Sequence, residues 1–214
     1  MALERFTTYT ELDENDHIEV SNFLLDVNGI TTSEDAWVYK DMGAAHFGET
    51  FEHDVKVTIR TSDLESICVL WAVSNVVEDR YYWYENASQA VCLFCNYLTV
   101  DRGYRFILKN EETGAVDVTA DKFISLDTPY YLVPKRTSDT STSCLIYLDA
   151  AKTNLLDTLT VAITAGRTYE HIFACNSSND GTGKAFSCDI ENLNLNEPTP
   201  IPIFRHHYEL LARR

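Results

Sequence analysis

The sequence predicts an all-β protein in which two antiparallel sheets pack face to face. Alternation of apolar and polar residues recurs through most of the 214 residues, and stretches with helical period are nearly absent. Polar segments rich in Asn, Asp and Gly, such as 110–114 and 176–183, carry the residues that turns require. Because one open sheet with so many strands would curl or split, two packed sheets are expected.

The expected strands follow the alternating, β-branched and aromatic runs of the chain. Within the long run 51–60, Val55, Val57 and Ile59 are expected to face the core and the polar residues between them to face solvent. In chain order the predicted strands are 17–20, 23–27, 36–41, 51–60, 66–73, 81–84, 90–97, 104–109, 116–119, 130–135, 143–149, 155–162, 169–175 and 186–195.

One domain is expected over residues 1–195, because no linker rich in Gly, Pro or Ser divides that stretch. Residues 196–214 are expected to form a spacer, stiffened by three prolines, and a short C-terminal arm. Residues 203–214 hold three Arg and one Glu, a net charge of +2, and their apolar side chains favour a role in assembly. The candidate assembly residues are Phe204, His206, His207, Tyr208, Leu210, Leu211, Arg213 and Arg214.

The overall charge excludes nucleic acid as an expected partner. The chain has 33 Asp and Glu against 17 Lys and Arg, a net charge of −16, and it lacks the clustered cations that neutralise phosphates. The acidic N-terminal segment lacks the apolar stretch of a secretory signal, and no apolar run is long enough to span a membrane. We therefore expect no membrane partner and a protein that is made in a cytoplasm.

The six cysteines are expected to be thiols, since disulfides are rare in a cytoplasm. Cys92 and Cys95 have the spacing of a redox or metal motif, but no second pair and no nearby His accompany them. In a strand their sulfurs would point to opposite faces, so buried thiols are favoured. No metal site or cofactor is expected. Calcium remains an alternative at the acidic turns 13–16 and 179–180.

Several segments together resemble the LamG or concanavalin A-like jelly-roll superfamily, in the variant common in tailed phages and environmental sequences. These segments are 51–59, 67–73, 130–136, 145–149 and 186–195. The resemblance implies a jelly roll and a non-enzymatic virion structural protein, either capsid decoration or a tail or fibre subunit. It would be made in the host cytoplasm and would contact copies of itself or a major capsid or tail protein. Pro134 interrupts segment 130–136, so a bulge or an edge position is expected there.

The resemblance also raises the laminarinase-type glycoside hydrolases, which carry two catalytic carboxylates on an E-x-D-x-x-E strand. The nearest match here, Glu52-His-Asp54, lacks the third carboxylate. The chain also has no G-x-S-x-G, P-loop or G-x-G-x-x-G motif. We therefore expect no enzyme, and a divergent glycosidase that uses Glu52 and Asp54 is the least favoured alternative.

Four consecutive aromatic residues, Tyr81, Tyr82, Trp83 and Tyr84, are the sharpest local feature of the sequence. Strand alternation would place Tyr81 with Trp83 on one face and Tyr82 with Tyr84 on the other, so at least two side chains are expected to be exposed. Core packing, a protein interface and stacking against a host-surface glycan all fit this pattern. A carbohydrate-binding module is therefore the alternative to a structural subunit.

Overall fold

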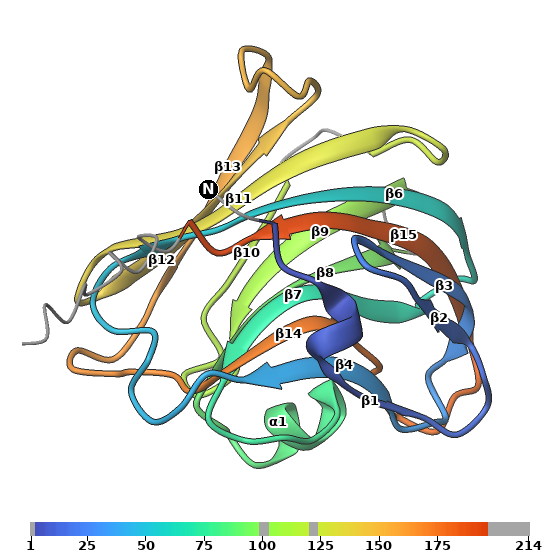
Figure 1. Ribbon diagram of the computed structural model, residues 1–214, viewed down its shortest axis with the longest axis horizontal. Coiled ribbons are helices and arrows are strands. Elements are labelled where there is room, and N and C mark those ends of the chain that lie inside the picture. The colour runs from blue at the N-terminus through green and yellow to red at the C-terminus, as the bar shows by residue number, and fades with distance from the viewer. Residues whose placement is uncertain (1–2, 99–102, 120–123, 197–214) are drawn as a thin grey trace, which may run out of the picture.

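Two antiparallel sheets packed face to face form the protein. The computed structural model describes residues 3–98, 103–119 and 124–196 (Figure 1). Within these ranges the helical elements are a 3-10 turn, η1 (Phe6–Thr8), and one short α-helix, α1 (Arg80–Glu85). The predicted two-sheet sandwich is confirmed.

Sheet A has seven strands and sheet B has eight. In spatial order sheet A contains β1 (Thr10–Asp13), β4 (Ala36–Asp41), β14 (His171–Asn176), β7 (Ile67–Ser74), β8 (Ala90–Leu98), β9 (Gly103–Asn110) and β10 (Val116–Val118). Sheet B contains β13 (Leu155–Ala162), β12 (Ser141–Tyr147), β11 (Pro129–Ser138), β6 (Asp54–Ser62), β15 (Ala185–Asn194), β3 (Leu24–Thr31) and β2 (Ile18–Val20), while β5 (Phe51–Glu52) pairs with β11.

The main core lies between the two sheets. On β6, Val55, Val57 and Ile59 are buried in it, as the alternation predicts, and the residues between them are partly exposed. Burying one such aliphatic side chain contributes about 1.5–3 kcal/mol. Sheet B therefore has one apolar face, which packs against sheet A, and one polar face, which is partly exposed to solvent.

Sheet A is apolar on both faces. On β7 the register shifts between Val69 and Trp71, and Leu70 and Trp71 both enter the main core. Val69 and Ala72 belong instead to a second apolar cluster on the opposite face. Helix α1 lies against that opposite face, so that sheet A sits between sheet B and α1 (Figure 1). We call this cluster the second core.

The bulge or edge position expected at Pro134 is not found at that residue, although the neighbouring strand is interrupted opposite it and β11 shifts register against β12 between Arg136 and Ser138. Strand β11 lies inside sheet B, and its pairing keeps register across the proline, with Leu132 opposite Val55 and Lys135 opposite Glu52. Pro134 accepts a hydrogen bond from the backbone N–H of His53, 2.9 Å away, at the break between β5 and β6. The proline therefore costs the sheet one N–H donor without displacing the strand.

All six cysteines are buried free thiols, as predicted. Cys92 lies in the second core and Cys95 in the main core, which confirms the expected opposite faces. Burial raises the pKa of both thiols, so neither is present as the nucleophilic thiolate at neutral pH.

Strand β15 ends at Asn194 and the described residues end at Asn196, so the domain boundary expected at residue 195 stays a prediction. The predicted assembly residues, from Phe204 to Arg214, lie outside the described residues. No helix in the described part of the chain is long and apolar enough to cross a membrane.

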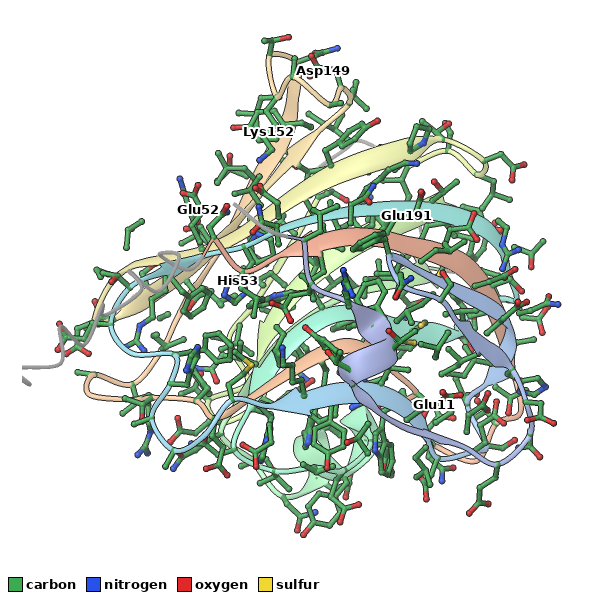
Figure 2. All side chains as sticks on the ribbon, viewed as in Figure 1. Glu11, Glu52, His53, Asp149, Lys152 and Glu191 are labelled. Carbon is green, nitrogen blue, oxygen red and sulfur yellow. The ribbon has the colours of Figure 1, made fainter. Side chains whose placement is uncertain are left out.

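His53 generates a prediction about acid stability. Its ring lies between the two sheets (Figure 2) and accepts a hydrogen bond from the indole N–H of Trp71, with 3.0 Å between Nε1 and Nδ1. Burial, with a smaller contribution from His46, lowers the pKa of His53 to about 3. Between pH ~6.5 and 3 the unfolded chain therefore binds a proton that the folded chain does not, and stability falls as the pH drops.

We expect His53→Gln to remove this acid sensitivity. From pH 6.5 to 4.5 the wild type should lose about 2–3 kcal/mol of unfolding free energy relative to the variant, because each pH unit is worth ~1.36 kcal/mol. Urea unfolding at several pH values measures the difference. A difference that stays constant over this range would contradict a neutral, buried His53.

Candidate functional site

The four consecutive aromatic residues form a helix and not the predicted strand. Helix α1 begins after Asp79, whose side chain accepts hydrogen bonds from the backbone N–H groups of Tyr81 and Tyr82, at 2.6 and 3.1 Å. An Asp in this position is a strong helix N-cap, and it satisfies donors that the first turn leaves unpaired. The Asp79 cap thus favours a helix over the strand that was predicted from the aromatic residues 81–84.

Trp83 anchors the helix to sheet A. Its side chain is fully buried in the second core, where the indole packs edge-on against Phe173 at 4.9 Å between ring centres. The indole N–H donates to the carbonyl of Val76, 3.2 Å away. Because successive helical residues are rotated by about 100°, an inward Trp83 turns its tyrosine neighbours outward. The predicted shared face of Tyr81 and Trp83 is therefore wrong.

Buried charges hold the start of the helix in place. The Glu111 side chain is fully buried and pairs with Arg80 at 3.0 Å and with Lys109 at 2.7 Å. The Arg80 guanidinium also lies 4.4 Å from the centre of the Phe94 ring. A buried carboxylate with two cationic partners is costly to disrupt, because removing one partner leaves an uncompensated charge. Helix α1 is thus fixed by charge as well as by apolar contact.

Three exposed tyrosines make up what we call the tyrosine surface. Tyr81, Tyr82 and Tyr84 are 37%, 42% and 52% exposed, which confirms that at least two of the aromatic residues face solvent. The rings of Tyr81 and Tyr84 lie 6.2 Å apart, and Lys109 Nζ lies 4.3 Å from the centre of the Tyr84 ring. The nearby Glu85 carboxylate raises the pKa of Tyr81, mainly through its negative charge and also through a hydrogen bond with the phenol.

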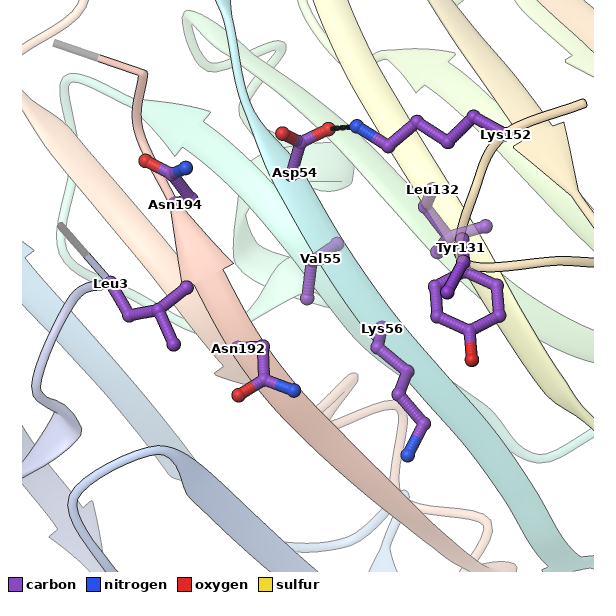
Figure 3. A pocket seen from close by; sticks show the side chains of 10 residues that line it. Leu3, Asp54, Val55, Lys56, Tyr131, Leu132, Lys152, Asn192 and Asn194 are labelled. Carbon is purple, nitrogen blue, oxygen red and sulfur yellow. Dashed lines mark hydrogen bonds and ion pairs between the residues drawn. The ribbon is translucent and has the colours of Figure 1, made fainter. Parts of the chain in front are cut away.

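A pocket of about 190 Å³ opens on the face of sheet B turned away from the core (Figure 3). Asp54 forms an ion pair with Lys152 and accepts a hydrogen bond from Asn196 Nδ2 at 3.1 Å. The pocket is smaller than the ~300–1,000 Å³ of drug-sized ligand sites. Its lining residues are Leu3, Asp54, Val55, Lys56, Tyr131, Leu132, Ala150, Lys152, Asn192 and Asn194.

The structure does not bring Glu52 and Asp54 together in this pocket. Asp54 lines it, but Glu52 does not, and Glu52 is exposed on β5. The ion pair with Lys152 also occupies the Asp54 carboxylate. A retaining or inverting glycosidase needs two carboxyl groups on either side of one bound sugar linkage. Asp54 therefore lines this pocket without Glu52, and a glycosidase that uses this pair stays the least favoured alternative.

The two acidic turns named as calcium candidates differ in the structure. Asn179 is used internally, because its N–H donates to Asp79 at 3.1 Å and its side-chain amide donates to Asp35 at 3.0 Å. The turn 13–16 instead brings Asp13 close to His17 and Glu34. Sequence reasoning missed both of these partners, although His17 directly follows the acidic turn.

Comparisons with known proteins fix the fold. No family model matches the chain. No curated protein matches it by sequence. Among solved structures, the lectin UEA-II in complex with galactose is similar, with 7% identity, a TM-score of 0.54, and coverage of 90% of this chain and 97% of that one. The exoplasmic/lumenal domain of VIP36 bound to Ca²⁺ and Man3GlcNAc has 9% identity, a TM-score of 0.51, and coverage of 91% and 88%.

The fold is a concanavalin A-like jelly roll. A third similar structure, GH43B of a Bacteroides ovatus xyloglucan locus, has 14% identity and a TM-score of 0.52. The match covers 87% of this chain, but only 36% of that protein. At these identities the comparisons establish the jelly roll alone, because one fold serves many functions.

The buried ion pairs of Glu111 predict that two adjacent glutamates contribute very different amounts to the stability of the fold. We expect Glu111→Gln to lower the unfolding free energy by about 3–5 kcal/mol, since it leaves Arg80 and Lys109 without their buried partner. Glu112 pairs with Arg167 in a partly exposed position, so the control Glu112→Gln should cost only about 0–1 kcal/mol. Urea unfolding of both variants measures the costs, and equal costs would contradict the role assigned to Glu111.

Proposed function

We propose that the protein is a carbohydrate-binding domain and that the tyrosine surface is its binding platform. The observation that carries this proposal is the exposure of three tyrosines on a helix that is fixed to sheet A, with the rings of Tyr81 and Tyr84 only 6.2 Å apart. The apolar C–H face of a sugar ring packs on an aromatic ring, and the phenol hydroxyls can bond the sugar hydroxyls. Because Trp83 and Glu111 hold the helix, ligand binding need not order it.

Two further observations support a neutral glycan as the ligand. The similar structures include a lectin in complex with galactose and a domain bound to Man3GlcNAc, both built on this jelly roll. The net charge of −16 disfavours acidic polysaccharides, since a strongly negative surface repels them. We therefore expect neutral oligosaccharides to bind better than sulfated or uronate-rich ones.

The phage structural role expected from the sequence stays a prediction. The arm that motivates it lies outside the described residues, and the jelly roll occurs both in lectins and in a glycoside hydrolase. Self-association, a shell or tail partner, a virion location and the absence of enzymatic activity are likewise untested predictions. A fibre-borne glycan-binding domain would satisfy both hypotheses.

A glycan array followed by titration calorimetry tests the platform. We expect the double variant Tyr81→Ala/Tyr84→Ala to weaken binding of the best glycan about tenfold, since each aromatic contact is worth about 0.5–1.5 kcal/mol. The control is Phe23→Ala, which removes an aromatic ring that is 40% exposed between β2 and β3. Wild-type affinity in the double variant would reject the platform, and the absence of any bound glycan would reject the function.

A second pair of variants tests the pocket on sheet B and the hydrolase alternative. We expect Tyr131→Ala and the double variant Glu52→Gln/Asp54→Asn to bind the same glycan with wild-type affinity. Release of reducing sugar from the bound oligosaccharide is expected to be absent. If Tyr131→Ala lost glycan binding while Tyr81→Ala/Tyr84→Ala kept it, the pocket on sheet B would be the binding site in place of the tyrosine surface. Turnover abolished by the double variant would establish a glycosidase.

A further inference from the structure

Three side chains from separate segments meet at one edge of the sandwich. Asp13 ends β1 of sheet A, His17 directly precedes β2 of sheet B, and Glu34 lies in the connection from β3 to β4. One ligand atom from each lies within 4.8 Å of the other two. His17 Nδ1 and Glu34 Oε1 are 2.8 Å apart. The cluster therefore joins the two sheets through side chains.

Asp13 has an oxygen atom that the protein leaves unsatisfied. Its Oδ2 accepts a hydrogen bond from the backbone N–H of Ile18, 2.6 Å away, while its Oδ1 is buried and has no hydrogen-bond partner. A buried carboxylate oxygen without a donor is unfavourable. Among the described ion pairs none joins Asp13 or Glu34 to a Lys or Arg. A cation bound between these side chains would give the Asp13 carboxylate a further partner and offset the negative charges of Asp13 and Glu34.

Glu34 is held in place by the surrounding chain. The backbone N–H of Thr31 and the side-chain amide of Asn15 both donate to its carboxylate, and its side chain is only 5% exposed. Ser177 fixes the Glu34 backbone, because its hydroxyl donates to the Glu34 carbonyl at 2.8 Å. Such outer contacts orient a ligating carboxylate before the metal arrives.

The donor set identifies the class of metal. Calcium prefers ligand shells made of oxygen atoms, so an imidazole nitrogen does not fit the calcium considered for the acidic turn 13–16. One imidazole and two carboxylates suit a divalent transition metal, with water in the remaining positions. We propose that Asp13, His17 and Glu34 bind a divalent transition metal of the zinc type, which ties sheet A to sheet B at this edge. This site is independent of glycan binding.

Metal content and thermal stability of the full-length protein test the proposal. The protein is stripped with EDTA, dialysed, and titrated separately with ZnCl₂, MnCl₂ and CaCl₂. Because the ligands meet only in the folded chain, we expect one tightly held zinc and a Tm rise of about 5–10 °C at a hundredfold excess over Kd. Calcium should produce no comparable rise.

Matched variants locate the metal. His17→Gln and Asp13→Asn should each weaken zinc binding at least tenfold and remove the Tm rise, while His46→Gln and the double variant His206→Gln/His207→Gln should retain both. Asp13→Asn keeps the shape of the side chain, so it remains informative if His17→Gln does not fold. Zinc affinity unchanged in Asp13→Asn, or no bound zinc in the wild type, would overturn the proposal.

Discussion

The structure depends on a sheet that is apolar on both faces. Sheet B covers one face of sheet A, and Trp71 enters the core between them. The opposite face would expose Val69, Phe94 and Phe173 if α1 did not cover it with Trp83. The one α-helix among the described residues thus supplies the apolar cover that the second face of sheet A needs. The inward indole forces the neighbouring tyrosines toward solvent, so the candidate site is a consequence of core packing.

Most strands could be predicted because they follow from the alternation of apolar and polar residues within each segment. Alternation on β6 places Val55 and Val57 inward, and the same period separates Cys92 from Cys95. The helix could not be predicted from alternation, since the Asp79 cap and the apolar face that receives Trp83 decide it. The position of Pro134 in the sheet could not be predicted, because the strand that pairs with β11 is determined by the chain topology and not by the sequence around the proline.

For the candidate sites too, features of the local sequence could be predicted, whereas contacts between residues distant in the sequence could not. Aromatic exposure at residues 81–84 could be expected, but the identity of the buried residue required the helix. The acidic turn that contains Asp13 was visible, whereas Glu34 approaches it only because the β3 strand returns the chain to the same edge. Similar jelly rolls occur in lectins and in a hydrolase, so function has to be argued from such added features.

The buried cysteines give this protein a set of internal reporters. Cys92 lies beneath α1, and Cys95 and Cys188 lie between the sheets. A thiol reagent can reach Cys92 when the helix lifts, but it reaches Cys188 only when the two sheets separate. The order in which the native thiols are alkylated therefore distinguishes opening of the tyrosine-bearing helix from unfolding of the whole sandwich, without any introduced label.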